Sequence, residues 1–155
     1  SQAGAEAVYG IHRSPVHAQR LAEMGIVPIA QDDTAAVNAA AAQAGVVYDA
    51  TGGSLAEAIL SVMPETGTFV CYGLLSGQTF RQQRPLPRVA WFHIRNYLDA
   101  LSAEAWQAEF RRIWPKLRAS QCSDVTLYPL SEWQRAVGNY REAGRTGKPM
   151  LSMDN

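Results

Sequence analysis

The fold is decided by residues 46–77, which read VVYDATGGSLAEAILSVMPETGTFVCYGLLSG. Two short apolar runs, 46–50 and 68–73, flank a stretch from Leu55 to Val62 whose apolar residues recur at helical spacing. An apolar run without polar alternation is typical of a strand that is buried on both faces, as in a parallel sheet. The stretch therefore predicts a strand, a helix and a second parallel strand, and with them an α/β class of fold.

The same alternation of short apolar runs and helical stretches continues on both sides of this unit. It predicts strands at 7–11, 26–30, 88–94, 125–128 and 149–153, and helices at 16–24, 35–44 and 132–143. A further helix begins at Asp99 or Ser102, and Pro115 is expected to kink or end it. The order of elements predicts a doubly wound, mostly parallel sheet.

Length, composition and charge exclude several classes of protein. The 155 residues suit one domain, and a hydrophobic fraction of 47% is well above that of a disordered chain. Lysine plus arginine balance aspartate plus glutamate at 14 each, so no basic excess indicates a nucleic-acid partner. Cys71 and Cys122 lie far apart without clustered histidines, which indicates neither a disulfide framework nor a zinc site. No apolar run approaches about 18 residues and no signal peptide is recognisable, so the expectation is a soluble cytoplasmic protein without a membrane partner.

A first candidate site follows the predicted strand at 7–11. In dinucleotide-binding folds the end of the second strand adjoins the adenosine ribose, and a carboxylate there accepts its hydroxyl groups. Here the chain has His12, Arg13 and Ser14, with His17 one turn further. The missing carboxylate argues against NAD, whereas a guanidinium beside a hydroxyl suits a 2′-phosphate, and Ser14 before Pro15 is expected to cap a helix. The alternative is a solvated turn between strand and helix.

Small residues follow two more predicted strands. Thr51-Gly52-Gly53 comes after the strand at 46–50, and Tyr72-Gly73-Leu74 follows the next one. Glycines at the carboxyl ends of parallel strands let a ligand approach the backbone, although a plain turn capped by Ser54 is the alternative. Asp32 and Asp33 are interpreted as a helix cap, His93 as a structural histidine, and Cys71 as a packing residue.

These stretches together resemble the medium-chain dehydrogenase/reductase superfamily, and most closely its zinc-independent quinone oxidoreductase and enoyl reductase branch. The resemblance lies in GIHRS and LAEMG within 10–25, VYDATGG at 47–53 and GTFVCYGLLSG at 67–77. YPLSE at 128–132, before a helix with Ala136, and GKPML at 147–151 resemble that family's closing helix and strand. The similarity covers essentially the whole chain and implies a Rossmann-like fold.

The resemblance implies an NADPH site with no metal, and it assigns no catalytic residue. Arg13, Ser14 and His17 match positions that hold the 2′-phosphate, while Gln31 falls where many relatives have a tyrosine near the adenosine. By the same resemblance, the cofactor is lined by Thr51 and Gly52, its nicotinamide by Tyr72, Gly73 and Leu74, its carboxamide by Phe92, His93 and Ile94, and its phosphates by Lys148 or Arg145.

Two parts of such enzymes are not recognisable in the sequence, namely the first strand with its glycine-rich loop and the N-terminal catalytic domain. Residues 1–124 are therefore expected to form a partial dinucleotide-binding domain, and 125–155 a helix and strand that in relatives pack back toward the catalytic domain. The length is interpreted as that of a truncated protein, inactive by itself.

Two functional hypotheses remain open. The first is the C-terminal part of a homodimeric NADPH-dependent oxidoreductase that transfers hydride to a small-molecule enone, quinone or enoyl thioester. The second is a non-catalytic module that dimerises by pairing of the strand within 88–97 across a two-fold axis. A methyltransferase-like domain is disfavoured because no acidic residue stands at His12.

Overall fold

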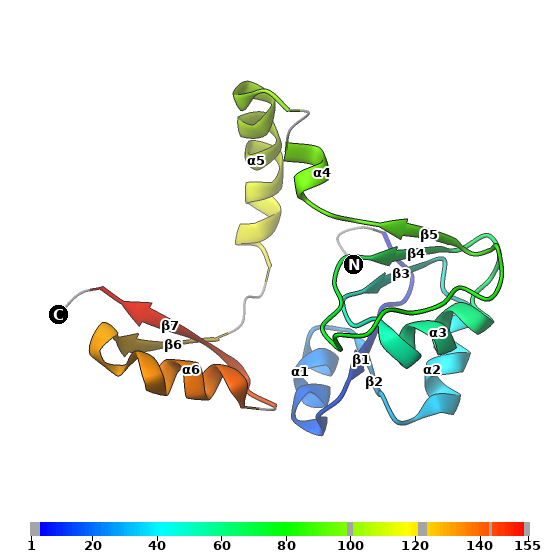
Figure 1. Cartoon of the computed structure of the whole chain (residues 1–155), viewed down its shortest axis with the longest axis horizontal. Helices are drawn as coiled ribbons and strands as arrows, with labels where there is room; N and C mark the ends of the chain where they lie inside the picture. The colour runs from blue at the N-terminus through cyan, green and yellow to red at the C-terminus, as the bar shows by residue number, and fades with distance from the viewer. Residues whose placement is uncertain (1–3, 99–100, 121–123, 143, 154–155) are drawn as a thin grey trace. The chain divides into compact units, whose positions relative to one another are not determined.

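The computed structural model describes residues 4–98, 101–120, 124–142 and 144–153 (Figure 1). It divides into two compact units, one made of residues 1–28 and 107–155 and the other of residues 29–106. In chain order the elements are β1 (Tyr9–His12), the 3-10 helix η1 (Pro15–His17), α1 (Ala18–Glu23), β2 (Val27–Ala30), α2 (Thr34–Ala41), β3 (Val46–Asp49), α3 (Gly53–Val62), β4 (Thr68–Cys71), β5 (Arg88–Trp91), α4 (Arg95–Leu98), α5 (Ala103–Arg118), β6 (Asp124–Pro129), the 3-10 helix η2 (Leu130–Glu132), α6 (Trp133–Arg141) and β7 (Gly147–Ser152).

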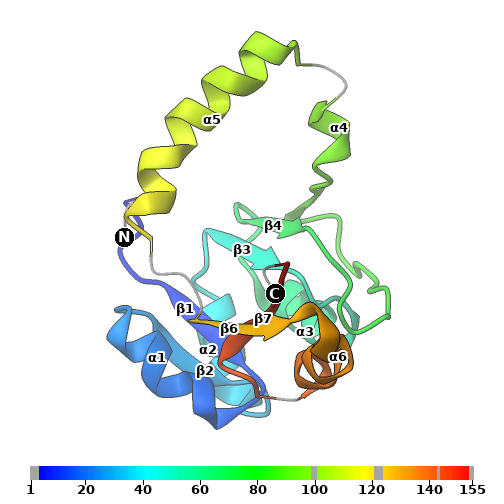
Figure 2. The same ribbon diagram turned by 90° about the vertical axis from the view of Figure 1, so that its left-hand side faces the viewer.

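The first unit contains a strand, helix and strand motif near the C-terminus. β6 pairs with β7 in parallel, and α6, which connects them, packs against both strands (Figures 1 and 2). Ala136 is the α6 residue buried by this packing, at 7% exposed. Near the N-terminus of the chain, β1 pairs with β2, and η1 with α1 forms the connection between them.

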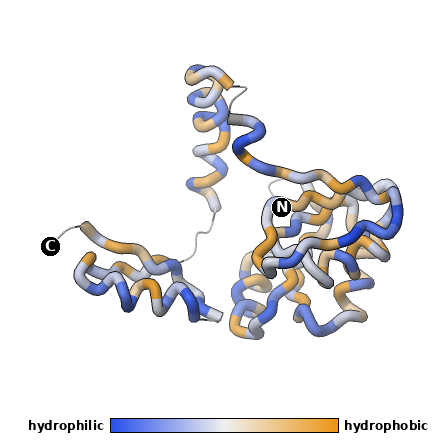
Figure 3. Tube along the Cα trace, viewed as in Figure 1, coloured by the Kyte–Doolittle hydropathy of each residue, from blue (hydrophilic) through white to orange (hydrophobic). Residues whose placement is uncertain are grey.

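The long helix α5 corrects an expectation. It runs from Ala103 through Pro115 to Arg118, so of the two expected effects of Pro115, an end or a kink, the end does not occur. Proline removes one backbone donor, but its carbonyl still accepts from the amide of Ala119 at 3.2 Å, so the helix continues. Ser102 caps the N-terminal end of α5, since its Oγ accepts from the amide of Ala105 at 3.3 Å. Asp99, the other expected start, lies outside the described residues. Hydrophobic residues recur along α5 (Figure 3).

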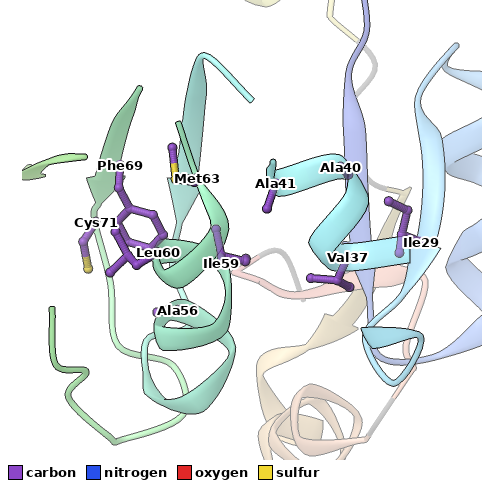
Figure 4. Packing of buried hydrophobic residues seen from close by; sticks show 10 residues of the cluster. All are labelled: Ile29, Val37, Ala40, Ala41, Ala56, Ile59, Leu60, Met63, Phe69 and Cys71. Atoms are coloured by element: carbon purple, nitrogen blue, oxygen red, sulfur yellow. The ribbon is translucent and has the colours of Figure 1, made fainter. Parts of the chain in front are cut away.

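The second unit is built on a parallel sheet with the order β3-β4-β5. α2 and α3 pack together, and their apolar side chains meet those of β4 in one core (Figure 4). Phe69 on β4 is completely buried, whereas Val46 and Tyr48 on β3 are 52% and 73% exposed. Within this unit by itself, helices therefore cover one face of the sheet.

The register of this sheet positions the loops that follow its strands. Asp49, Cys71 and Trp91, the last residues of the three strands, lie beside one another. Because the strands are parallel, the chain leaves all of them at the same edge. The sequence predicted this arrangement for the segments after β3 and β4, and the α/β class with parallel strands is confirmed.

Helix ends are stabilised partly as the sequence predicts. The carboxylate of Asp33 accepts from the amide of Ala36 at 3.0 Å, which confirms the predicted cap of α2. The C-terminal end of α3 is stabilised by a residue from a later segment. Arg84 donates to the carbonyls of Leu60 and Met63 at 2.8 and 3.0 Å. Terminal helix carbonyls have no partner within the helix, so a guanidinium suits them well.

Several boundaries and caps differ from the expectations. The helix expected from 16 begins as a 3-10 turn at Pro15, and the side chain of Ser14 makes no capping bond. Gly52, rather than Ser54, precedes α3. The strand expected to reach 94 ends at Trp91, since the chain turns into α4, and the last helix ends at Arg141, with Ala143 outside the described residues. Among the described residues, the strands form separate sheets of 2, 3 and 2 strands.

Among the residues that the structure describes, no helix is both long and apolar enough to cross a membrane.

Candidate functional site

A basic concavity of about 640 Å³ lies in the first unit, at the end of β1. Its walls are the end of β1, the η1 and α1 helices, and Gly144 from the turn before β7. Among the described residues, four basic side chains line it, those of His12, Arg13, His17 and Arg20, and no carboxylate does. The concavity is therefore suited to an anionic group.

The two arginines of the concavity differ in their contacts. Arg20 donates to the carbonyl of Thr146 at 3.4 Å and lies 3.8 Å from the carboxylate of Asp124, so it braces the wall. Arg13 is exposed, and among the described residues its guanidinium makes no hydrogen bond or ion pair. A planar guanidinium with all its donors available matches the oxygens of a phosphate.

The predicted partners of Arg13 lie where the sequence places them. Ser14 and His17 both line the concavity. The hydroxyl of Ser14 does not cap the following helix, so it is available to a ligand. Ser14, His17 and Arg13 are thus brought together, as predicted, although the capping role of Ser14 is wrong.

The glycine before β7 allows the turn to approach this group. Gly144 has a φ of +75°, and a Cβ atom there would lie 3.0 Å from the Oγ of Ser14. The turn is held by Arg145, which donates to the carbonyl of Tyr140 at 3.4 Å and lies 4.4 Å above its ring. Any side chain at 144 would therefore press on Ser14.

A second group of predicted residues lies in the unit 29–106, at the carboxyl edge of the sheet. Its centre is Asp49, which is 5% exposed and which the sequence interpretation did not single out. The Asp49 carboxylate accepts from the amides of Thr51 and Gly52 at 3.0 and 2.9 Å. Burial of a carboxylate requires such bonds, and these fix the turn after β3.

The loops after β3 and β4 are hydrogen-bonded to each other. The hydroxyl of Ser76 donates to the carbonyl of Thr51 at 2.7 Å, and the amide of Leu75 donates to that of Ala50 at 2.8 Å. The amide of Gly53, at the start of α3, donates to the carbonyl of Gln78 at 3.1 Å. This backbone donor at the N-terminal end of α3 is therefore already bonded to another part of the chain.

The glycines of these loops serve this close approach. A Cβ atom on Gly52 would lie 2.5 Å from Cδ2 of Leu74 and 2.6 Å from the carbonyl oxygen of Gln78. One on Gly73 would lie 3.0 Å from the carbonyl oxygen of Ala50. The predicted residues Thr51, Gly52, Gly73 and Leu74 are therefore brought together, with Tyr72 exposed beside them.

The remaining predicted residues are placed separately. The amide of Phe92 donates to the carbonyl of Cys71 at 2.8 Å, and its ring stacks on Tyr97 at 5.3 Å. His93 is exposed rather than packed in a core, which corrects the structural interpretation, and Ile94 is 51% exposed. Gln31 lies exposed after β2, and Lys148 lies exposed on β7 outside the residues that line the concavity.

Cys71 has the packing role that was expected. It is 1% exposed, and its thiol donates to the carbonyl of Gly73 at 3.3 Å. Burial raises the pKa of this thiol, so the neutral form is favoured.

Sequence reasoning missed Asp49, Ser76 and Arg20 as parts of these sites. An aspartate two residues before Thr51-Gly52 is the sequence signal for an Asx-type turn. The partners of Ser76 and Arg20 lie 25 and 126 residues away in the chain, so no local pattern marks them.

Parallel strands whose following loops meet at one edge, together with a basic strand end, define an α/β domain of the dinucleotide-binding class. The profile of the family described as "Zinc-binding dehydrogenase" matches residues 26–151, and the chain belongs to that family. This confirms the resemblance to the medium-chain dehydrogenase/reductase superfamily. No curated protein matches the sequence.

Solved structures with the same fold are about twice as long. A protein of Bacillus thuringiensis described as an NADPH:quinone reductase superimposes with a TM-score of 0.79 at 22% identity, over 94% of this chain and 48% of that one. The CurK enoyl reductase gives a TM-score of 0.72 at 20% identity, over 97% of this chain and 48% of that one. The mycobacterial protein Rv1454c, solved with NADPH, gives a TM-score of 0.71 at 16% identity, over 94% of this chain and 48% of that one. The chain spans about half the length of these structures.

The family description mentions zinc. Within them, no three histidine, cysteine, aspartate or glutamate residues lie close enough together to hold a metal ion. The residues that are described offer no set of zinc ligands, so no role is assigned to zinc in this part of the protein.

Proposed function

We propose that this chain is the cofactor-binding, C-terminal part of a cytoplasmic NADPH-dependent oxidoreductase. Its acceptor is a small molecule with an enone, quinone or enoyl thioester group. The observation that carries the proposal is the concavity at the end of β1, which is lined by Arg13, Ser14 and His17 and, within the described part of the chain, by no carboxylate. Two of the superimposed structures are described as a quinone reductase and an enoyl reductase, and a third, the mycobacterial Rv1454c, contains NADPH.

Arg13 is the main binding residue in this proposal. Its guanidinium donates to the 2′-phosphate, with the Ser14 hydroxyl and the His17 imidazole as further donors. A hydrogen bond to a charged group contributes about 1.5–3 kcal/mol, and 1.4 kcal/mol corresponds to about a tenfold change in affinity. Arg13 alone therefore accounts for a preference of NADPH over NADH of about tenfold to a hundredfold.

The loops at the carboxyl edge of β3, β4 and β5 orient the other end of the cofactor. Bound NADPH supplies the hydride through its nicotinamide. In this proposal Thr51 and Gly52 lie along the cofactor, while the segments 72–74 and 92–94 approach the nicotinamide. The turn at Thr51 and Gly52 is held because its amides donate to the Asp49 carboxylate and the carbonyl of Thr51 accepts from the Ser76 hydroxyl.

Contacts to the adenosine and the phosphates complete the proposed site. Gln31 would lie near the adenosine and Lys148 near the phosphates. Both side chains are exposed, so neither has a competing packing role.

The C-terminal segment 125–155 is proposed to pack on the rest of the polypeptide. Leu127 is 66% exposed, and Met150 and Trp133 are 47% and 50% exposed. Exposed large apolar side chains favour contact with another part of the protein, and the resemblance implies that this part is the catalytic domain.

Cofactor preference in the complete native polypeptide tests the proposal. We expect the dissociation constant for NADPH to be at least about tenfold below that for NADH, and Arg13→Gln to remove most of the difference. Arg111→Gln, which removes an exposed arginine on α5, is the matched control and should leave both constants unchanged. Equal affinities of the unaltered protein for both cofactors would refute the proposal.

A non-catalytic dimerisation module is the second candidate. β5 is an edge strand of its sheet, and Trp91, Phe92, Ile94 and Tyr97 are 58%, 42%, 51% and 53% exposed. An edge strand with neighbouring aromatic residues favours pairing with a second copy. Light scattering combined with a cofactor titration separates the candidates, because a module of this kind forms a dimer and binds no NADPH.

A further inference from the structure

The turn before β7 forms one wall of the concavity at the end of β1. Gly144 lines the concavity together with Ser14, although the two residues lie far apart in the sequence. A Cβ atom on Gly144 would lie 3.0 Å from the Oγ of Ser14 and 3.5 Å from its Cβ. The backbone of the turn therefore lies directly against the Ser14 side chain, and a side chain at 144 would require Ser14 to move.

Contacts from two helices hold this turn in place. Arg20 on α1, which lines the concavity, donates to the carbonyl of Thr146 at 3.4 Å. Arg145 donates to the carbonyl of Tyr140 on α6 at 3.4 Å and lies 4.4 Å from the centre of its ring. The turn is thus tied to both helices, so its distance from Ser14 is set by packing within the first unit.

We propose that Gly144 is a specificity-determining residue of the concavity, because its lack of a side chain leaves the Ser14 hydroxyl where it binds the 2′-phosphate. The inference rests on the proposed function, since it takes the 2′-phosphate of NADPH as the ligand. It adds to that function a determinant of cofactor preference from the C-terminal segment.

The direction of the Ser14 hydroxyl depends on such neighbours. The hydroxyl makes no capping bond to the helix that follows, so that helix does not fix its rotamer. A serine side chain has three staggered rotamers, which direct the oxygen differently. A Cβ atom at 144 would crowd the present position of Oγ but would lie at an ordinary contact distance from the Cβ of Ser14. Rotation of the hydroxyl relieves this contact, and the oxygen then leaves its present position in the concavity.

Loss of the hydroxyl from this position affects the two nicotinamide cofactors differently. A hydrogen bond to a charged phosphate contributes enough that its loss weakens binding by about tenfold or more. NADH has no 2′-phosphate, so it makes no such charge-assisted bond. Backbone strain at position 144, in contrast, lowers the stability of the protein whichever cofactor is bound.

The test is a double-mutant cycle in the complete native polypeptide, with the dissociation constants for NADPH and NADH as the measured quantities. We expect Ser14→Ala and Gly144→Ala each to lower the preference for NADPH by about tenfold, with the affinity for NADH unchanged within about twofold. The double variant should also lose about tenfold, rather than about a hundredfold, because both changes remove the same bond.

Backbone strain has its own control, since alanine is unfavourable at the φ of +75° of Gly144. Gly25 in the same unit has a φ of +73°, and a Cβ atom there would meet nothing within 4 Å. Gly25→Ala should therefore leave the preference for NADPH unchanged. Retained NADH binding shows that a variant is folded. Gly144→Asn replaces Gly144→Ala if that variant loses NADH binding, because asparagine tolerates a positive φ better and still places a Cβ atom beside Ser14.

The outcomes separate this inference from the proposed function. A preference for NADPH that Ser14→Ala or Gly144→Ala leaves unchanged, or that Gly25→Ala lowers equally, overturns the inference and leaves the function standing. A loss of about a hundredfold in the double variant also overturns it, because Gly144 then acts independently of Ser14. Loss of NADH binding in both Gly144 variants assigns that residue to folding alone and overturns the inference. No preference for NADPH in the unaltered protein overturns both.

Discussion

Replacing Gly52 by alanine tests the contact between the loops after β3 and β4. Gly52 has a φ of +69° and a ψ of −158°, a conformation that is essentially restricted to glycine. A Cβ atom would also lie 2.6 Å from the backbone oxygen of Gln78, which accepts from the amide of Gly53. Backbone strain of about 1–3 kcal/mol and overpacking of about 1–3 kcal/mol together predict a loss of about 2–6 kcal/mol in unfolding free energy.

Two other glycines provide matched controls. Gly25 also has a positive φ, of +73°, but a Cβ atom there would meet nothing within 4 Å, so Gly25→Ala should lose only about 1–2 kcal/mol. Gly45 has open space and no positive φ, so Gly45→Ala should be neutral or stabilising by up to about 1 kcal/mol. Urea unfolding of the complete polypeptide measures all three variants. If Gly52→Ala lowers the unfolding free energy by no more than Gly25→Ala does, the loops after β3 and β4 are not in contact and the reasoning is wrong.

Two further predictions concern the same unit. Arg84→Met removes the donors to the carbonyls of Leu60 and Met63 and should lower the unfolding free energy by about 1.5–3 kcal/mol, while Arg81→Met, which removes an exposed side chain, should change it little. Equal losses in the two variants would contradict the assigned contact. Burial raises the pKa of the Cys71 thiol in the folded protein above that in the unfolded chain. The neutral thiol therefore contributes fully to the unfolding free energy below the ordinary thiol pKa, and this contribution is lost as the pH rises through the raised pKa. In a Cys122→Ser background a thiol reagent should label Cys71 far more slowly in the native protein than in urea at the same pH, and equal rates would argue against its burial.

Parts of the fold that depend on neighbouring residues could be predicted from the sequence. The order of helices and strands, the parallel strands 46–49 and 68–71 and the Asp33 cap all follow from patterns a few residues long. Where two local rules competed, one predicted outcome was wrong: Pro115 does not end α5, because the loss of one backbone donor does not outweigh the surrounding helix.

The candidate site was predictable only in part. Arg13, Ser14 and His17 are close in sequence and follow one strand, so their position at the strand end placed them in one concavity. His93 was interpreted as structural because its neighbours are apolar, but the strand ends before it, and the side chain is exposed. Apolar neighbours in a sequence do not reveal which side chains other elements will cover.

The sequence by itself determined the class of fold, the order of its elements and the basic residues after the first strand. Only the tertiary structure decided that, among the described residues, Arg20 has hydrogen-bond and ion-pair partners while Arg13 has none, that His12 has an orphaned nitrogen, and that Ser76 donates to the carbonyl of Thr51. The physical reason is range. Helix and strand preferences act over a few residues, whereas burial and hydrogen-bond partners depend on segments brought together from far along the chain, such as Arg20 and Thr146.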